Sequence, residues 1–389
     1  MSPEFFRWND DYQKLKNFDG YFIPGGFSYE DRVRAGAIAA RDGVMNIIKE
    51  EAETGKPVIG ICNGAQILVE SGLIPGLESY HLGSALAWNN RGFLNIWVRI
   101  KNDSKSGKSA FNNYEQGHHF RLPIAHGEGR WVIEEKLLKQ LIDNGQAVFR
   151  YCDEDGEIKN EYPVNPNGAV YNIAGVCNPA GNVLALMPHP ERVDGGQVIF
   201  CSMKKYLENG RAYVKELVLN KLKLKTKNLK LLEYQKPSNS IEFLIDLIIT
   251  DNEAETLQVA LGQLGYDDVK VRRFTHWEVG VDKQSDKLVD ELIKSGVLLN
   301  TNKEIPYVNQ RSKIKVRRSS HKLLVRYKDD FSGQSKLDTL NNRLNIKSVK
   351  SVKLGVLWEI ECKEDDWQKI LESNILFNPF SQEALIYAR

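Results

Sequence analysis

The sequence of 389 residues has little cysteine and no long apolar run, and both shortages narrow what the chain can be. Its five cysteines are scattered without a C-x-x-C pair, which argues against a disulfide framework and a zinc site. No apolar run approaches the roughly 20 residues of a membrane-spanning helix, and Met1-Ser2-Pro3-Glu4 lacks a signal-peptide profile. The net charge of +2 gives no case for nucleic acid or membrane as partner. We therefore expect a cytoplasmic protein.

A chain of this length is expected to form two or three domains. From Tyr21 to Ala212, short β-branched or aromatic runs alternate with helical stretches, which is typical of an α/β sheet. Three predicted strands, at 21–23, 58–61 and 183–186, are each followed by glycine-rich or polar residues. Doubly wound sheets gather their sites at the carboxyl ends of strands.

The second half of the chain reads as a tandem duplication. Trp277-Glu278-Val279 recurs as Trp358-Glu359-Ile360, and the strands before these segments also correspond. The residue pattern of each copy predicts a β-α-β-β-α-β unit in which two adjoining strands surround the Trp-Glu pair. The tryptophans can be core anchors or ligand stackers. Neither copy contains a nucleophile, a metal cluster or a phosphate loop, so we interpret this half as an interaction module.

These patterns predict four segments. They are an α/β domain at 1–214, a lysine-rich helix and linker at 215–239, and two repeats at 240–311 and 312–389. The lysine run at 221–230 contains no interleaved aromatic residue, which favours a solvated helix face over a nucleic-acid patch.

A thiol stands between two glycines at the end of the second predicted strand, in Gly60-Ile61-Cys62-Asn63-Gly64. A G-x-C-x-G step between a strand and a helix is the thiol form of a nucleophile elbow. The positive end of the following helix would favour the thiolate of Cys62 over the thiol. The alternative is a buried structural cysteine beside a turn.

A base and its orienting group occur together in Met187-Pro188-His189-Pro190-Glu191-Arg192. If the flanking prolines keep the backbone extended, residues two apart point the same way and Glu191 can fix the tautomer of His189. A rigid surface turn is the alternative. An oxyanion hole could form from the backbone N–H groups of Gly25 and Gly26 together with that of Asn63. A simple glycine turn would explain the same two glycines.

Three further residues are candidates for binding a small polar substrate. Gln66 lies on the first turn after the elbow, where a solvated helix residue is the alternative. His126 belongs to the polar segment Pro123 to Arg130, and without a neighbouring cysteine it suggests a positioning role. Phe27 follows the two glycines of the expected oxyanion loop.

The motifs together resemble one family of enzymes. Pro24 to Tyr29, Arg34-Ala35-Gly36, the Cys62 elbow, Pro123 to Gly129, Asn165 to Gly168 and Met187 to Arg192 resemble the glutaminase subunit of phosphoribosylformylglycinamidine synthase, a class I glutamine amidotransferase of purine biosynthesis. The resemblance implies a flavodoxin-like, mostly parallel sheet. Each copy of the duplication looks like the small subunit of the same synthase, with weaker residue identity.

The resemblance also implies a mechanism and a partner. Cys62 would attack the side-chain amide of glutamine, His189 would transfer protons and Glu191 would orient His189. The ammonia would pass to a separate synthetase subunit, the large subunit, which would carry the ATP and magnesium, and no cofactor is expected in this chain. Self-association through the repeats would also be possible. Family members begin with a strand and a helix ahead of the Pro-Gly-Gly-Phe strand, and that unit is apparently missing here.

Two other functions stay open at this point. An amidotransferase could serve another acceptor, although the duplication and the Cys-Asn-Gly variant argue against it. A catalytically silent scaffold that only bridges synthase subunits is favoured by the missing first unit.

Overall fold

The structure, a computed structural model, describes residues 2–209, 231–309 and 320–387. The chain divides into two compact units, Met1–Lys227 and Asn228–Arg389. Most of the predicted lysine-rich segment at 215–239, and the predicted boundary at 311–312, lie outside the described residues. Within the described ranges, no helix is both long and apolar enough to cross a bilayer.

The first unit is built from short strands and helices joined by 3-10 turns. Its strands are β1 (Tyr21–Ile23), β2 (Val58–Ile61), β3 (Ser84–Trp88), β4 (Leu94–Asn102), β5 (His119–His126), β6 (Glu128–Ile133), β7 (Phe149–Cys152), β8 (Ile173–Cys177) and β9 (Val183–Leu186). Its described helices are α1 (Gly43–Glu53), α2 (Asn63–Glu70), α3 (Glu135–Asp143) and α4 (Gln197–Glu208). The three strands that the sequence predicted, β1, β2 and β9, are confirmed with the predicted bounds.

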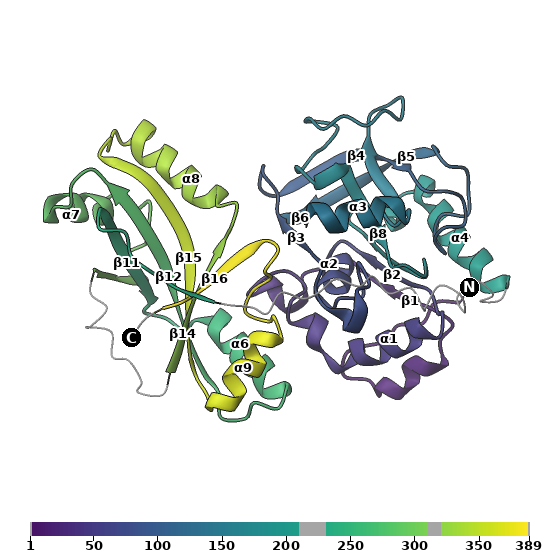
Figure 1. Ribbon diagram of the computed structural model, residues 1–389, viewed down its shortest axis with the longest axis horizontal. Helices are drawn as coiled ribbons and strands as arrows, with labels where there is room; N and C mark the ends of the chain where they lie inside the picture. Colours follow the sequence, from purple (N-terminus) through teal and green to yellow (C-terminus); the bar gives the residue numbers. More distant parts are fainter. Residues whose placement is uncertain (1, 210–230, 310–319, 388–389) are drawn as a thin grey trace. The chain divides into compact units, whose positions relative to one another are not determined.

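Seven of these strands form one sheet in the order β1-β2-β9-β8-β7-β4-β5. The strand β2 pairs in parallel with β1 and with β9. The remaining neighbours pair antiparallel, so the prediction of a mostly parallel sheet is wrong in its proportions, although the α/β class is confirmed. Antiparallel neighbours such as β8 and β9 need only a short turn between them, whereas the parallel pair β1 and β2 is joined through α1. Strands β4 and β5 lie at the end of the sheet away from β1 (Figure 1).

The fully buried central strands set the position of the nucleophile. Every residue of β2 and β9 is buried, and their side chains join one apolar cluster with helices α1, α2 and α4. Burial on both faces is what the continuous apolar runs of these strands predict. The carboxyl end of β2, where Cys62 follows, is therefore fixed by packing from both sides.

The second unit contains two copies of one element pattern around a second sheet. The first copy consists of β11 (Ser240–Leu247), α6 (Asn252–Gln263), β12 (Lys270–Val281), α7 (Asp286–Lys294) and β13 (Glu304–Val308). The second consists of β14 (Ser320–Tyr327), α8 (Phe331–Asp338), β15 (Val349–Glu361), α9 (Glu364–Glu372) and β16 (Gln382–Ile386), and the short strand β10 (Leu232–Glu233) precedes both. The sheet order is β10-β16-β14-β15-β12-β11-β13.

The two copies meet through their long central strands, which run antiparallel beside each other (Figure 1). Aligning the two Trp-Glu pairs makes Thr275 equivalent to Val356, and these two residues lie directly opposite each other in the β12–β15 register. Equivalent ion pairs flank this centre, with Arg272–Glu359 at 4.0 Å and Lys353–Glu278 at 3.8 Å. The second unit therefore has an internal two-fold relation between its copies.

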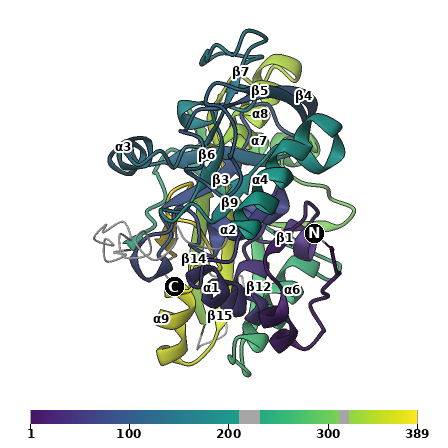
Figure 2. The same ribbon diagram turned by 90° about the vertical axis from the view of Figure 1, so that its right-hand side faces the viewer.

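One part of the predicted repeat pattern is wrong. The two adjoining strands expected around each Trp-Glu pair are one continuous strand in each copy, β12 and β15. The residues before the tryptophan in β12, Arg272 to His276, include no glycine or proline that would end a strand. Helices α7 and α8 lie toward one end of this sheet and α6 and α9 toward the other in both views (Figures 1 and 2).

The two equivalent tryptophans of the duplication are core residues. Trp277 is 4% exposed and Trp358 is 2% exposed. The Trp277 indole N–H donates to the Leu298 carbonyl at 2.8 Å. Of the two interpretations that the sequence left open, the structure therefore supports core anchors.

Candidate active site

The chain turns sharply at Cys62, which separates β2 from α2. Its backbone has φ +52° and ψ −106°, a conformation that costs a non-glycine residue of order 1–3 kcal/mol. Gly60 and Gly64 flank the turn, and neither position has room for a side chain because backbone atoms of nearby segments lie against it. A Cβ at Gly64 would lie 2.0 Å from the Ile23 carbonyl oxygen, and one at Gly60 would lie 2.4 Å from the Gly64 carbonyl oxygen. This is the geometry of a nucleophile elbow.

His189 and Glu191 form the predicted base and orienting pair. His189 Nδ1 lies 2.6 Å from Glu191 Oε1. Because a carboxylate can only accept, Nδ1 carries a proton, and in the neutral ring Nε2 then presents a lone pair. Nε2 is buried and has no hydrogen-bond partner among the described residues. The backbone between them is not extended as predicted, because Pro190–Arg192 form a 3-10 turn that brings the Glu191 carboxylate back to the ring.

Gly25 brings the loop after β1 against both the nucleophile and the base. A Cβ built on Gly25 would lie 2.7 Å from Cε1 of His189 and 3.5 Å from Cβ of Cys62. Gly26 has no heavy atom within 4 Å of such a position, so the next residue faces open space. The Cys62 sulfur is 3.7 Å from the Ala125 carbonyl oxygen at the end of β5. Loop, elbow and base thus converge in space although they are far apart in the sequence.

Burial keeps the thiol of Cys62 protonated at rest. It raises the pKa of Cys62 to about 11, even though the Asn63 backbone N–H and the charge of Arg192 both lower it. The predicted preference for thiolate is therefore wrong in direction, because desolvation outweighs the N-terminus of the helix. A thiol in this state needs a base to remove its proton during attack, and the free Nε2 of His189 can accept it.

The loop that carries Gly25 and Gly26 continues into a strained turn. Tyr29, Glu30 and Asp31 have φ of +52°, +55° and +54°. Such left-handed residues cost roughly 1–2 kcal/mol each when they are not glycine. Asn63 contacts both ends of this turn, through the Ser28 backbone N–H at 3.0 Å and the Asp31 carboxylate at 3.2 Å. Such hydrogen bonds contribute about 1 kcal/mol when neutral and about 2 kcal/mol to a charged group, which is of the order of the strain.

A buried ion pair anchors the same loop to α2 beyond the turn. Arg34 donates twice to Glu70 at the end of α2, from Nε at 2.9 Å and from the terminal nitrogen at 2.6 Å. Gly36 packs directly on this helix, since a Cβ there would lie 2.7 Å from the backbone of Gln66. The loop is therefore fastened at several points along the helix that begins at the nucleophile.

Two acidic side chains near the elbow have raised pKa values. Burial raises the pKa of Asp31 to about 6. Burial, and then the charge of Asp31, raise the pKa of Glu128 to about 8, although Arg34 and the Ala35 backbone N–H lower it. Glu128 is the first residue of β6 and lies beside this loop, with its carboxylate 3.4 Å from the Ala35 nitrogen. The carboxyl of Asp31 thus gains its charge near pH 6 rather than at its usual lower pH.

His126 is held as a neutral, buried ring. Burial lowers its pKa to about 3, and the neighbouring His189 lowers it further. The Asn89 amide nitrogen contacts its Nδ1 at 3.2 Å, and a Cβ at Gly129 would lie 2.2 Å from the ring. Its position near His189 is compatible with the positioning role that the sequence suggested, which stays a prediction.

The remaining predicted substrate residues differ in exposure. The Gln66 side chain is buried, accepting from Asn63 at 2.9 Å and donating to the Glu128 carbonyl at 2.5 Å, so it is not the solvated helix residue of the alternative. Phe27 is 66% exposed beside the loop. Contact with substrate stays a prediction for both residues.

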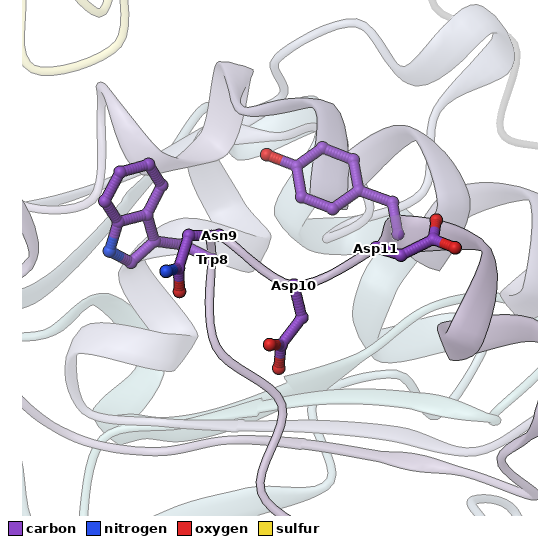
Figure 3. A pocket seen from close by; sticks show the side chains of 5 residues that line it. Trp8, Asn9, Asp10 and Asp11 are labelled. Atoms are coloured by element: carbon purple, nitrogen blue, oxygen red, sulfur yellow. The ribbon is translucent and has the colours of Figure 1, made fainter.

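Other candidate sites are few in the described part of the chain. It contains no group of three or more His, Cys, Asp or Glu residues that could hold a metal ion. A surface hollow of about 370 Å³ is lined by residues 8–12 (Figure 3). None of the predicted site residues lines it, and it holds no nucleophile. The convergence at Cys62 is the best candidate for chemistry.

Comparison with known proteins identifies the family. Residues 7–202 match the CobB/CobQ-like glutamine amidotransferase domain. The phosphoribosylformylglycinamidine synthase subunit PurQ of Methanothrix thermoacetophila is 47% identical over 240 residues, covering 54% of this chain and 90% of that protein. The PurQ subunit of Aquifex aeolicus is 47% identical over 190 residues, covering 49% and 78%. This chain belongs to the PurQ family of glutamine amidotransferases.

A solved structure of PurLQS from Thermotoga maritima is also similar to this amidotransferase. It is 37% identical, covers 50% of this chain and 82% of that one, and has a TM-score of 0.41.

Several residues at the amidotransferase site were not predicted as site residues. Glu128 lies within the polar segment Pro123 to Arg130, and Asp31 lies two residues after the motif Pro24 to Tyr29. A carboxylate in or next to a motif was therefore the sequence feature that could have indicated both residues. Asn89 reaches His126 across 37 positions of the chain, and nothing in the sequence indicates that contact.

The close approach of Gly25 to His189 predicts a specific sensitivity. Gly25→Ala would place a methyl group on the His189 ring and displace it from Cys62, so we expect the glutaminase rate to fall about 100-fold. Gly195→Ala is the matched control, because a Cβ there meets nothing within 4 Å. Steady-state ammonia release from glutamine measures both. Equal rates for the two variants would contradict this placement of His189.

The raised pKa of the thiol predicts how Cys62 reacts with iodoacetamide. Between pH 7 and 9 the alkylation rate should rise about tenfold per pH unit without a plateau, because only the thiolate reacts. Arg192→Gln should slow alkylation at a given pH, since the Arg192 charge lowers the pKa of Cys62. Mass spectrometry of the Cys62 peptide follows the reaction, with Arg121→Gln as control. A plateau near pH 7 would show a thiolate at rest.

Proposed function

We propose that this chain is the glutaminase subunit of phosphoribosylformylglycinamidine synthase and supplies ammonia to a separate synthetase subunit in purine biosynthesis. The observation that carries the proposal is the convergence of Cys62, His189 and Gly25 in a member of the PurQ family. The relatives are named as subunits of that synthase. The chain is thus a glutamine amidotransferase that works with a synthetase.

The first half of the reaction forms a thioester. Cys62 Sγ attacks the side-chain amide carbon of glutamine while its proton passes to Nε2 of His189. The oxygen of the tetrahedral intermediate becomes negative and is met by the N–H groups of Asn63 and Gly26. When the intermediate collapses, the carbon–nitrogen bond breaks and His189 returns the proton to the leaving amine. Ammonia and a glutamyl thioester on Cys62 result.

The second half releases glutamate. His189 removes a proton from a water molecule, the hydroxide adds to the thioester carbon, and the carbon–sulfur bond breaks with the proton returning to the thiolate of Cys62. Glu191 keeps Nδ1 of His189 protonated throughout, so that Nε2 is always the atom that exchanges protons. The free thiol is restored, which matches its raised pKa at rest.

The second unit is the proposed binding module for the synthetase. Its two copies, 240–311 and 312–389, correspond to two small subunits of the synthase fused in tandem. Their internal two-fold relation across β12 and β15 supports this reading. Self-association through the same module would be a further use of it. ATP and magnesium belong to the synthetase, and the cytoplasm is the compartment in which free thiols such as Cys62 persist.

Replacing the nucleophile tests the enzyme. With purified synthetase, Cys62→Ala should reduce ammonia release from glutamine to background, a loss of at least about 10⁴-fold. The same complex should still form product when ammonium salt is added, because the synthetase is intact. Cys201→Ala removes an exposed thiol and should behave as wild type. Ammonia release that survives Cys62→Ala would exclude the thioester mechanism, and a wild-type chain without activity would indicate a silent scaffold.

Truncation tests the binding module. A chain that ends at Asn239 should no longer elute with the synthetase in size-exclusion chromatography, whereas its Cys62 should be alkylated at the wild-type rate if the first unit is folded. Undiminished elution with the synthetase would refute the bridging role.

A further inference from the structure

The side-chain amide of Asn63 connects the elbow to the oxyanion loop. Its Oδ1 accepts from the Ser28 backbone N–H at 3.0 Å, and its Nδ2 donates to Asp31 at 3.2 Å and to Gln66 at 2.9 Å. Asn63 is the first residue of α2 and is buried. Every polar atom of this side chain therefore has a partner, and two of the three partners lie on the loop after β1.

The orientation of this amide is determined by its partners. The Ser28 N–H can only donate and the ionised Asp31 carboxylate can only accept, which places Oδ1 toward Ser28 and Nδ2 toward Asp31. Gln66 is oriented by the Glu128 carbonyl, which accepts from its Nε2 at 2.5 Å. Hydrogen bonds thus run in one direction from Ser28 through Asn63 and Gln66 to Glu128, and a flipped amide would place like groups together.

The two loop contacts of Asn63 bracket the left-handed turn at Tyr29 to Asp31. This turn begins three residues after Gly26, and Gly25 faces both Cys62 and His189. If the turn relaxed, the loop that carries these glycines would shift relative to the sulfur. The position of the oxyanion loop therefore depends on a side chain that belongs to the elbow itself.

We propose that the side chain of Asn63 is a positioning residue for the glutaminase reaction. It keeps the strained turn closed, so that the N–H groups of the Gly25-Gly26 loop and of Asn63 itself meet the same developing oxyanion. The inference rests on the proposed function and gives the side chain a role apart from that of the backbone N–H. Alignment of this kind acts when charge develops, so its loss lowers kcat with little change in KM for glutamine.

Asn63→Asp tests this role directly. The change keeps an oxygen that accepts from the Ser28 N–H, but it removes the two N–H groups of the amide. The introduced carboxyl then faces two acceptors, the carboxylate of Asp31 and the side-chain amide oxygen of Gln66. In the complex with synthetase, kcat for ammonia release at pH 8 should fall about 100-fold. As the pH is lowered toward 6, a proton shared between the two carboxyls restores a donor, and kcat relative to wild type should rise about tenfold.

The exchange of the two groups is the decisive variant. Asp31→Asn combined with Asn63→Asp restores the hydrogen bond in the reverse direction, and it should recover most of the lost kcat and remove its pH dependence. Wild type and Asp31→Asn, measured over the same pH range, account for the pH dependence of the other groups near the site, among them Cys62 and Glu128. Asn46→Asp makes the same chemical change at an exposed position of α1 and serves as control.

A second variant keeps the test independent of the introduced charge. Asn63→Ser cannot reach both ends of the turn and carries no titrating group, so it should lose kcat equally at pH 8 and pH 6. Iodoacetamide alkylation of Cys62 needs no oxyanion hole, so it should still occur in all variants, which shows that the elbow is folded. Its rate should follow only the charge at residues 31 and 63, because the Asp31 charge raises the pKa of Cys62.

The inference is overturned if both Asn63 variants stay within about twofold of wild type. It is equally overturned if the loss in Asn63→Asp is independent of pH and persists in the exchange variant. Failure of the proposed function is distinct, because it would appear as absent ammonia release in the wild-type chain.

Discussion

The active site depends on one steric constraint, the close contact of Gly60, Gly64 and the end of β1 around a strained Cys62. The Ile23 carbonyl oxygen occupies the space that any side chain at residue 64 would need. This contact fixes where α2 begins relative to β1, and therefore how the loop after β1 meets the thiol. Because β2 and β9 are buried on both faces, the strain at Cys62 is maintained by the packing of the whole sheet. Nucleophile, base and oxyanion loop are aligned by this frame, since each follows the carboxyl end of a neighbouring strand.

Burial gives this site its electrostatic character. A thiol with a raised pKa, a neutral His126 and a His189 whose Nε2 has no partner in the described part of the chain characterise the site at rest. In the proposed mechanism the proton of Cys62 is removed as the sulfur attacks, so activation of the thiol and formation of the oxyanion are coupled. Such coupling limits side reactions, because a thiolate present before substrate binds would react with other electrophiles.

Much of the fold and of the site followed from local sequence. The strands β1, β2 and β9 and the pairing of His189 with Glu191 depend on apolar runs, glycines and short spacings that are visible in the chain. The duplication was visible in the same way, and the pairing of Thr275 with Val356 shows what it produces. The proportion of antiparallel pairs, the protonated Cys62 and the contacts of Asn63 depend on which segments meet in space. Desolvation and long-range hydrogen bonds of this kind leave no periodic pattern in the sequence.

The central claim is that glutamine is cleaved through a covalent bond to Cys62. The most direct measurement is to mix the full chain and its synthetase with glutamine, quench with acid within one turnover, and analyse the intact chain and its peptides by mass spectrometry. The account predicts a glutamyl adduct on the peptide that contains Cys62, and none on Cys152, Cys177, Cys201 or Cys362. Ammonia release without any adduct on Cys62 in a quench that traps other thioesters would contradict it.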